Sequence, residues 1–170
     1  MEELKEFIDD YPDFPKKGIL FKDLTPIFAN PNVFSKLISN MSLSPIINDA
    51  DALISIDARG FLLGSALALK TQKPMIMARK PGKLPGELCE NDYALEYGRN
   101  SLAIQKKSVQ KFKKFAIVDD LLATGGTVSC VVKILSSLKK DVSGISVVVE
   151  LKDLKARSNI NTPIISQLTL

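Results

Sequence analysis

The segment with the clearest pattern is Phe115-Ala116-Ile117-Val118-Asp119-Asp120-Leu121-Leu122-Ala123-Thr124-Gly125-Gly126-Thr127. It begins as an apolar strand, passes through two acidic residues and a loop of small residues, and enters a helical pattern that runs to Lys139. Parallel α/β sheets are built from such units, and they bind ligands beyond the carboxyl ends of their strands. We therefore expect this segment to lie at the rim of a parallel sheet and to face a ligand.

The loop at the end of this segment suits a phosphate group. Gly125 and Gly126 carry no side chain, so the backbone there can approach an anion closely. The N–H groups that open the next helix direct the positive end of its dipole toward the same place. Thr124 and Thr127 add hydroxyl donors. The loop therefore predicts a bound phosphate, and it lacks the patterns of nucleoside-triphosphate and dinucleotide loops.

The acidic pair Asp119-Asp120 suits a different part of the same ligand. Carboxylates repel a phosphate, but they accept hydrogen bonds from vicinal hydroxyls and can bind a divalent cation. The pair and the loop together predict a sugar that carries hydroxyls and a terminal phosphate. The alternative is an ordinary aspartate cap at a strand-to-helix turn, which leaves the second acid and the glycine-threonine loop unexplained.

Outside this segment, short apolar runs alternate with helical patterns, which is typical of an α/β fold with a mostly parallel sheet. A length of 170 residues predicts a single domain. Residues 11–23 are expected to form a loop, and residues 79–99 are expected to be mostly irregular, as in a lid. The sequence further predicts strands at 52–56, 74–78, 101–105, 115–118 and 145–149, an edge strand at 164–168, helices at 2–9, 61–69 and 127–139, and a helix that starts at Asn30-Pro31.

The composition excludes several classes of function. The chain has no histidine and only two cysteines, Cys89 and Cys130, which excludes most zinc sites and every Ser-His or Cys-His catalytic arrangement. Its first residues do not form a signal or transit peptide, and its most apolar stretch, Phe61–Leu69, is too short to span a bilayer. The net charge is a mild +4, and the lysine-rich residues 106–114 are expected to be a solvated connection. We expect a soluble, cytoplasmic protein that binds neither nucleic acid nor membrane.

Residues 117–127 resemble the phosphoribosyl pyrophosphate (PRPP) binding motif of the type I phosphoribosyltransferases, in the form found in adenine phosphoribosyltransferases. The resemblance implies a Rossmann-like open, mostly parallel sheet flanked by helices, with an N-terminal hood segment (residues 1–30) and a flexible catalytic loop (residues 79–99). It also implies that Asp119 and Asp120 hold the ribose hydroxyls. The residues implied to hold the 5′-phosphate are Ala123, Thr124, Gly125, Gly126 and Thr127.

Residues Tyr11–Pro26 are similar to the base-recognition segment of that family. The resemblance implies that Leu20, Phe21 and Lys22 form the adenine site, because an aliphatic and an aromatic side chain can sandwich a flat purine. Plain core packing is the alternative for Phe21. The family usually has arginine where this chain has Lys22, and lysine keeps the charge but lacks the planar guanidinium.

The segment Asp57-Ala58-Arg59-Gly60-Phe61 resembles the family's pyrophosphate loop, in which a strained or cis non-proline peptide bond is often found. A guanidinium fork matches phosphate oxygens, so Arg59 is the main candidate there. The resemblance implies that Asp57, Ala58 and Arg59 bind pyrophosphate.

Residues 79–86 and 93–98 together resemble the family's flexible loop. In related dimers, the residue matching Arg79 reaches the neighbouring subunit's site. Glu96 and Tyr97 correspond to residues that close over adenine and the anomeric carbon of the ribose. The cations implied to bind the pyrophosphate leaving group are Arg79, Lys80 and Lys83.

The resemblance runs from about Tyr11 to Leu168, and it implies an enzyme of purine salvage that converts adenine and PRPP to AMP and pyrophosphate. Mg²⁺ would be held mainly through PRPP or pyrophosphate. Glu96, Tyr97 and Arg59 would be the catalytic residues, and the enzyme would be a homodimer. Two alternatives stay open: a phosphoribosyltransferase for guanine, hypoxanthine or xanthine, and a PRPP-sensing regulator with the same fold.

Overall fold

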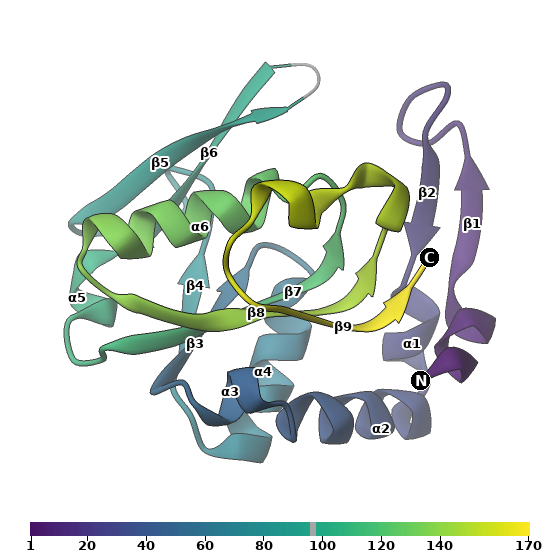
Figure 1. Ribbon diagram of the computed structural model, residues 1–170, viewed down its shortest axis with the longest axis horizontal. Coiled ribbons are helices and arrows are strands. Elements are labelled where there is room, and N and C mark those ends of the chain that lie inside the picture. The colour runs from purple at the N-terminus through teal and green to yellow at the C-terminus, as the bar shows by residue number, and fades with distance from the viewer. Residues whose placement is uncertain (96–97) are drawn as a thin grey trace.

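The computed structural model describes residues 1–95 and 98–170, and its centre is a five-stranded sheet (Figure 1). All neighbouring strands of this sheet run parallel, in the order β4-β3-β7-β8-β9. The predicted α/β fold with a mostly parallel sheet is therefore confirmed, and β9 is the predicted edge strand. The strands span Met75–Ala78 (β4), Ala52–Ile56 (β3), Lys114–Leu122 (β7), Asp141–Glu150 (β8) and Ile164–Thr169 (β9).

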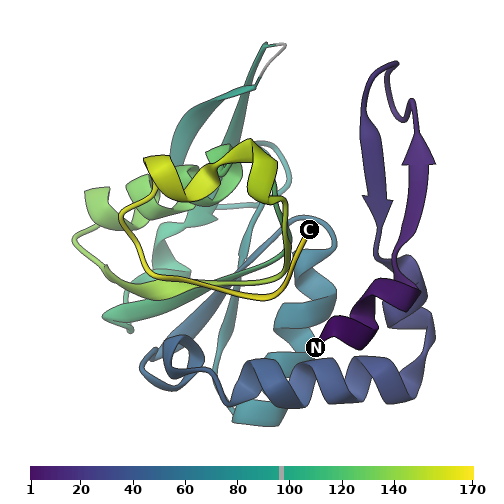
Figure 2. The same ribbon diagram turned by 45° about the vertical axis from the view of Figure 1, so that its right-hand side comes forward.

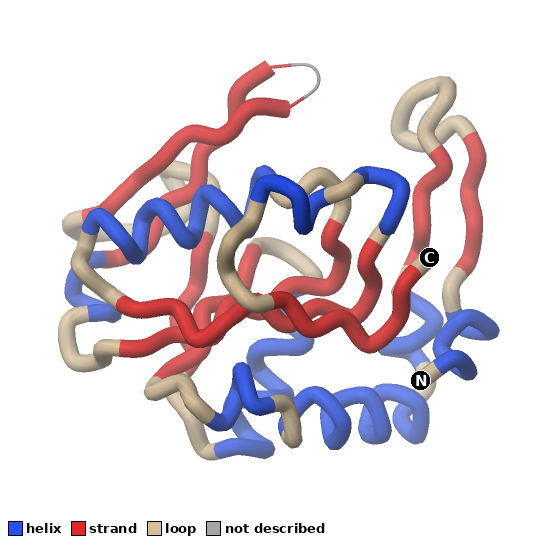
Figure 3. Tube along the Cα trace, viewed as in Figure 1, coloured by secondary structure: helices blue, strands red, loops and turns tan. Residues whose placement is uncertain are grey.

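Helices cover both faces of the sheet, as Figure 3 shows. One face carries α6 (Gly126–Ser137), whose apolar side joins the core around Ile117. The other carries α4 (Gly60–Thr71) and α2 (Pro31–Ser42), which enclose a second core around Val118. Successive residues of a strand point to opposite faces, so neighbouring residues of β7 serve different cores. This burial on both faces explains why residues 115–118 of β7 form a continuous apolar run.

The prediction that residues 11–23 form a loop is confirmed for residues 13–19 and wrong for the ends of the segment, which belong to a hairpin. Strand β1 (Asp9–Pro12) pairs antiparallel with β2 (Leu20–Asp23), and Tyr11 lies opposite Phe21. The prolines and glycine that suggested a loop sit at the end of β1 and in the turn. Because the hairpin is largely exposed, its strands lack the alternation of apolar and polar residues that marks a half-buried strand.

The prediction that residues 79–99 are mostly irregular is confirmed for residues 80–87 and wrong from Leu88 onward among the described residues. Strand β5 (Leu88–Leu95) pairs antiparallel with β6 (Gly98–Gln105), and the strand predicted at 101–105 is the second half of β6. Two backbone hydrogen bonds between Arg79 and Ala103 tie this hairpin to the end of β4. Both hairpins stand on the same side of the molecule, one on each side of the short helices that follow β8 (Figure 2).

The remaining elements are short. The N-terminal η1 (Glu2–Phe7) is a 3-10 helix that covers most of the expected helix at 2–9. Helix α2 begins as predicted, because the Asn30 side chain accepts a hydrogen bond from the Asn32 N–H at 3.1 Å. None of the described helices is long and apolar enough to cross a membrane. The others are α1 (Thr25–Ala29), α3 (Pro45–Asn48), α5 (Lys106–Val109), η2 (Lys152–Leu154) and η3 (Ala156–Asn159).

Candidate active site

The acidic pair lies near the carboxyl end of β7, where both side chains are buried. Asp119 is 8% exposed and Asp120 is 5% exposed. The Asp120 N–H donates a hydrogen bond to Asp119 Oδ1 at 2.9 Å. Burial, and then the charge of Asp120, hold the pKa of the Asp119 carboxyl well above its usual range. The pair is therefore a buried polar group at the sheet rim, with one carboxyl that takes up a proton readily.

Arg59 connects the acidic pair to the hood. Its Nε lies 2.7 Å from Asp120 Oδ2, and its guanidinium carbon lies 5.4 Å from the centre of the Phe21 ring, within cation–π range. Phe14 packs edge-on against Phe21, with ring centres 5.1 Å apart. A single side chain thus reaches from the rim of the sheet to the base-recognition segment.

Arg79 makes a second ion pair with the pyrophosphate loop. It follows β4 directly, and its Nε lies 2.8 Å from Asp57 Oδ2. Its guanidinium also lies 5.6 Å from the centre of the Phe61 ring. The Asp57–Ala58 peptide bond is cis, which is the geometry that the family resemblance led us to expect in this loop.

The turn between β7 and α6 has a backbone conformation and a packing that require glycine at position 125. Gly125 has a φ of 84°, in the left-handed region, and stands at the N-terminal cap of α6. A Cβ at this position would lie 2.6 Å from Ile160 Cδ1 and 3.3 Å from Ala156 Cβ. The first N–H groups of an α-helix have no partner inside the helix, so they are available to an anion at this turn.

The structure brings several predicted residues together. Arg59, Asp120 and Phe21 form one connected group, and Arg79 and Asp57 form another. Leu20, beside Phe21 in the same strand, is half exposed. The predicted residues Ala58 and Thr124 are exposed, whereas Ala123, Gly126 and Thr127 are partly buried.

Other predicted residues are not part of these groups. Lys22 points to the opposite strand of the hairpin, where its Nζ lies 2.7 Å from Asp10 Oδ2. Lys80 and Lys83 are exposed in the turn between β4 and β5. Glu96 and Tyr97 lie outside the described residues.

Sequence reasoning missed two kinds of residue around this site. Phe14 was not predicted as a site residue. The presence of two phenylalanines, Phe14 and Phe21, in the base-recognition segment could have indicated that they pack together. Ile160 and Ala156 were overlooked because nothing in the sequence links them to Gly125.

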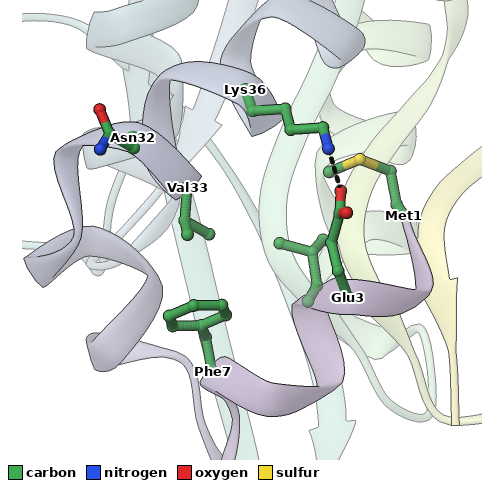
Figure 4. Close-up of a pocket in the computed structure, with 7 residues that line it drawn as sticks. Met1, Glu3, Phe7, Asn32, Val33 and Lys36 are labelled. Atoms are coloured by element: carbon green, nitrogen blue, oxygen red, sulfur yellow. Dashed lines mark ion pairs between the residues drawn. The ribbon is translucent and has the colours of Figure 1, made fainter.

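An apolar pocket lies elsewhere on the molecule (Figure 4). It has a volume of about 230 Å³ and sits between η1 and the start of α2, with Phe7 and Val33 among its lining residues. An ion pair of 2.6 Å between Lys36 and Glu3 lies at its edge. None of the predicted site residues lines it, so it carries no argument about the chemistry.

Comparison with known proteins gives the class of this chain. The family model described as the phosphoribosyl transferase domain matches residues 24–161, a span that includes the acidic pair and the turn at Gly125. The chain therefore belongs to the phosphoribosyl transferase family and is a phosphoribosyltransferase.

Individual relatives narrow this class. Two adenine phosphoribosyltransferases of Prochlorococcus marinus are 58% identical over 167 residues (strain SARG) and 60% identical over 166 residues (strain MIT 9515), with 98% of this chain and 97% of each relative covered. The crystal structure of adenine phosphoribosyltransferase from Thermoanaerobacter pseudethanolicus is 41% identical, with a TM-score of 0.93 over 99% of both chains. That of the Saccharomyces cerevisiae enzyme, complexed with adenine and an imino-altritol bisphosphate, is 38% identical, with a TM-score of 0.90 over 97% of this chain and 96% of the other. Within its family, the chain belongs with the adenine phosphoribosyltransferases.

Proposed function

We propose that this chain transfers the phosphoribosyl group of PRPP to adenine through the site described above, with AMP and pyrophosphate as products. The position of Arg59 carries the proposal, because its Nε lies 2.7 Å from Asp120 Oδ2 and its guanidinium carbon lies 5.4 Å from the centre of the Phe21 ring. A ribose, a pyrophosphate and a base must meet around one anomeric carbon in this reaction. Arg59 touches residues proposed to bind the ribose and the base, and it is itself proposed to bind the pyrophosphate.

The sugar phosphate is proposed to lie along the rim between β7 and α6. Asp119 and Asp120 would accept hydrogen bonds from the ribose hydroxyls, since carboxylates only accept when ionised. The residues from Ala123 to Thr127 would hold the 5′-phosphate through their N–H and hydroxyl groups. Charge-assisted hydrogen bonds of this kind are each worth about 1.5–3 kcal/mol.

The pyrophosphate is proposed to bind between the pyrophosphate loop and the start of the flexible loop. Arg59 belongs to this loop and pairs with Asp120 of β7, and Arg79 is held beside the loop by its ion pair with Asp57. Asp57 and Ala58 would contribute the loop's backbone, and the exposed Lys80 and Lys83 would add charge from the turn after β4. Neutralising a leaving group with fixed cations lowers the barrier without any covalent step.

Adenine is proposed to lie against Leu20 and Phe21. The half-exposed Leu20 supplies apolar surface at this position, and the edge-on contact of Phe14 supports the Phe21 ring. Lys22 would act from a distance, because its ammonium group is engaged by Asp10.

The chemistry is a displacement at the ribose anomeric carbon by adenine N9, through a transition state with positive charge on the sugar. Positioning, exclusion of water and charge neutralisation supply most of the catalysis. Glu96 is proposed to exchange a proton with adenine or to stabilise the sugar cation, and Tyr97 to close over the base.

Mg²⁺ is proposed as the cofactor, bound mainly by oxygens of PRPP and pyrophosphate. Among residues 1–95 and 98–170, no three His, Cys, Asp or Glu side chains form a cluster that could hold a metal ion. The donors at the rim are the carboxylate oxygens of Asp119 and Asp120, and Mg²⁺ in phosphate sites is commonly held by one or two carboxylates plus substrate oxygens. When bound, the ion would neutralise charge on the pyrophosphate.

We further propose a cytoplasmic homodimer in which residues 1–170 form a single domain. Three exposed apolar side chains on one face support contact with a second copy of the chain. Leu62 and Leu69, two turns apart on α4, are 50% and 84% exposed, and Met77 on the neighbouring edge strand β4 is 38% exposed. Arg79 follows that edge strand directly, so the residue proposed to reach the partner's site borders this face. Two free thiols agree with a reducing compartment.

The decisive experiment measures pyrophosphate release from PRPP and Mg²⁺ with adenine, guanine, hypoxanthine or uracil. Release with adenine alone is the expected result. Release with another purine would keep the PRPP site and overturn the assignment of Leu20 and Phe21. PRPP binding without release for any base would instead favour a regulator.

A further inference from the structure

Glu150 is a buried carboxylate that the proposed reaction does not use. It ends β8, opposite Leu122 of β7, and it is 6% exposed. The Arg157 guanidinium donates to both of its oxygens, from Nε to Oε1 and from a terminal nitrogen to Oε2, each at 2.7 Å. The Ser166 hydroxyl donates to Oε2 at 3.0 Å.

Arg157 ties three elements together. It belongs to η3, it pairs with the end of β8, and its other terminal nitrogen donates to the carbonyl of Ile164 in β9 at 3.1 Å. A planar fork that donates two parallel bonds fixes orientation as well as distance. The contact with Glu150 holds the pKa of the Arg157 guanidinium above its usual range, and the pKa of the Glu150 carboxyl is lowered by the same partner.

The segment that Arg157 anchors borders the phosphate-binding turn. Ala156 directly precedes Arg157 in the chain and Ile160 follows Asn159 at the end of η3, and both approach Gly125 at the cap of α6. Figures 1 and 2 show η2 and η3 beside the start of α6, above the ends of β8 and β9. The path from Glu150 to the turn therefore has two steps, an ion pair and a side-chain contact.

We propose that Glu150 and Arg157 are positioning residues for the phosphate-binding turn: their ion pair presses Ala156 and Ile160 against Gly125 and so fixes the N–H groups that receive the 5′-phosphate. Neither residue is among those proposed to bind the ligand. The inference rests on the proposed function, because it assigns a support to the proposed phosphate site. It explains why a full charge is buried at the end of β8, where an apolar residue would pack at lower cost.

The test compares binding of ribose 5-phosphate, measured by calorimetry, with the KM for adenine. Arg157→Ala is expected to weaken ribose 5-phosphate binding about tenfold, or about 1.4 kcal/mol, while the KM for adenine changes less than about twofold. Arg157→Lys keeps the charge without the fork and is expected to recover part of the loss. Ile160→Ala leaves the ion pair intact and is expected to show the same selective weakening as Arg157→Ala.

Two controls separate positioning from general stability. Lys114→Ala breaks an exposed ion pair of 3.1 Å with Asp49 at the amino end of β7, and Ile47→Val trims a fully buried side chain below the sheet. Both are expected to leave ribose 5-phosphate binding unchanged, even where the melting temperature falls. The inference is overturned if Ile160→Ala and Arg157→Lys bind ribose 5-phosphate as tightly as the unmodified chain. It is also overturned if Ile47→Val, at an equal melting temperature, loses as much affinity for ribose 5-phosphate as those two variants. If the unmodified chain does not bind ribose 5-phosphate, the proposed phosphate site fails together with its support.

Discussion

The rim between β7 and α6 and the hood hairpin serve two halves of one proposed reaction with opposite degrees of burial. At the rim, Asp119 and Asp120 are almost fully enclosed and Gly125 is packed against Ile160. In the hood, Tyr11 and Leu20 are about half exposed. The rim thus resembles a preformed socket for a charged group, whereas the hood is an apolar surface that gains burial only when a base covers it. The comparison predicts that rim substitutions act through geometry and hood substitutions through lost contact area.

The largest effect is expected from Gly125→Val. A β-branched residue at a φ of 84° is strained by about 1–3 kcal/mol, and its side chain would overlap Ile160. Either the Ile160 side chain or the turn must move to remove this overlap, and a displaced turn would misplace the N–H groups proposed to bind the phosphate. The kcat/KM for PRPP is therefore expected to fall about 100-fold or more. Steady-state kinetics at varied PRPP measure this effect, with circular dichroism to verify folding.

The hood supplies a matched control for this prediction. Gly18 has a similar φ of 88°, but a Cβ there would meet nothing within 4 Å. Gly18→Val therefore carries the same backbone strain without the overlap, and it is expected to change kcat/KM for PRPP only a few-fold. A similar fall of kcat/KM for PRPP in the two variants would show that the packing of Ile160 on Gly125 does not cause the effect.

The next effect is expected from Phe21→Ala in the hood. Stacking of a base on an aromatic ring is worth about 1–3 kcal/mol, so the KM for adenine is expected to rise roughly tenfold or more. Tyr11→Ala is the control, because Tyr11 lies opposite Phe21 in the hairpin and is equally aromatic. Adenine titrations at saturating PRPP compare the two; an equal rise in both would assign the effect to the hairpin rather than to the Phe21 ring.

The rim was largely predictable from the sequence, and the hood was not. The acidic pair, the glycine turn and α6 are adjacent in the chain, so a local pattern contains the whole unit. The β1–β2 hairpin depends on pairing between segments, and its largely exposed strands leave no apolar periodicity to detect. The β5–β6 hairpin depends on such pairing as well, and only its buried part around Ala103 was predicted as a strand. The packing of Ile160 on Gly125 joins residues from separate elements, and only the folded chain reveals it. The roles of Glu96 and Tyr97 remain predictions from resemblance.

A smaller effect distinguishes, by its pH dependence, the buried carboxyl of Asp119 at the rim from that of Glu150 at the end of β8. Because the pKa of Asp119 is raised, its contribution to stability is full below its unfolded pKa of about 3.9 and is lost as pH rises through the folded value. Asp119→Asn is therefore expected to raise the melting temperature by a few degrees near neutral pH and to match the unmodified chain in acid. Calorimetric melting between about pH 4 and pH 8 measures the difference.

Glu150 supplies the opposite sign for the same experiment. Its pKa is lowered by Arg157, so its contribution to stability is present above the unfolded pKa and is lost as pH falls through the folded value. Glu150→Gln is expected to lower the melting temperature near neutral pH, with the difference shrinking in acid. A pH dependence of the same sign in both variants would contradict this account of the two carboxyls.

The smallest effect is expected from Lys22→Arg, which restores the residue that the family usually carries. In this chain the Lys22 ammonium is held by Asp10 across the hairpin, and exposed pairs of this kind are worth only about 0–1 kcal/mol. An arginine gains a planar fork that can keep this contact and also stack on a base. The KM for adenine is therefore expected to fall by no more than about threefold, and Lys22→Arg combined with Asp10→Asn, which frees the guanidinium, is expected to lower it further. Adenine titrations decide the matter: a KM unchanged in both variants would mean that this position only braces the hairpin, and that Leu20 and Phe21 alone provide the apolar surface for the base.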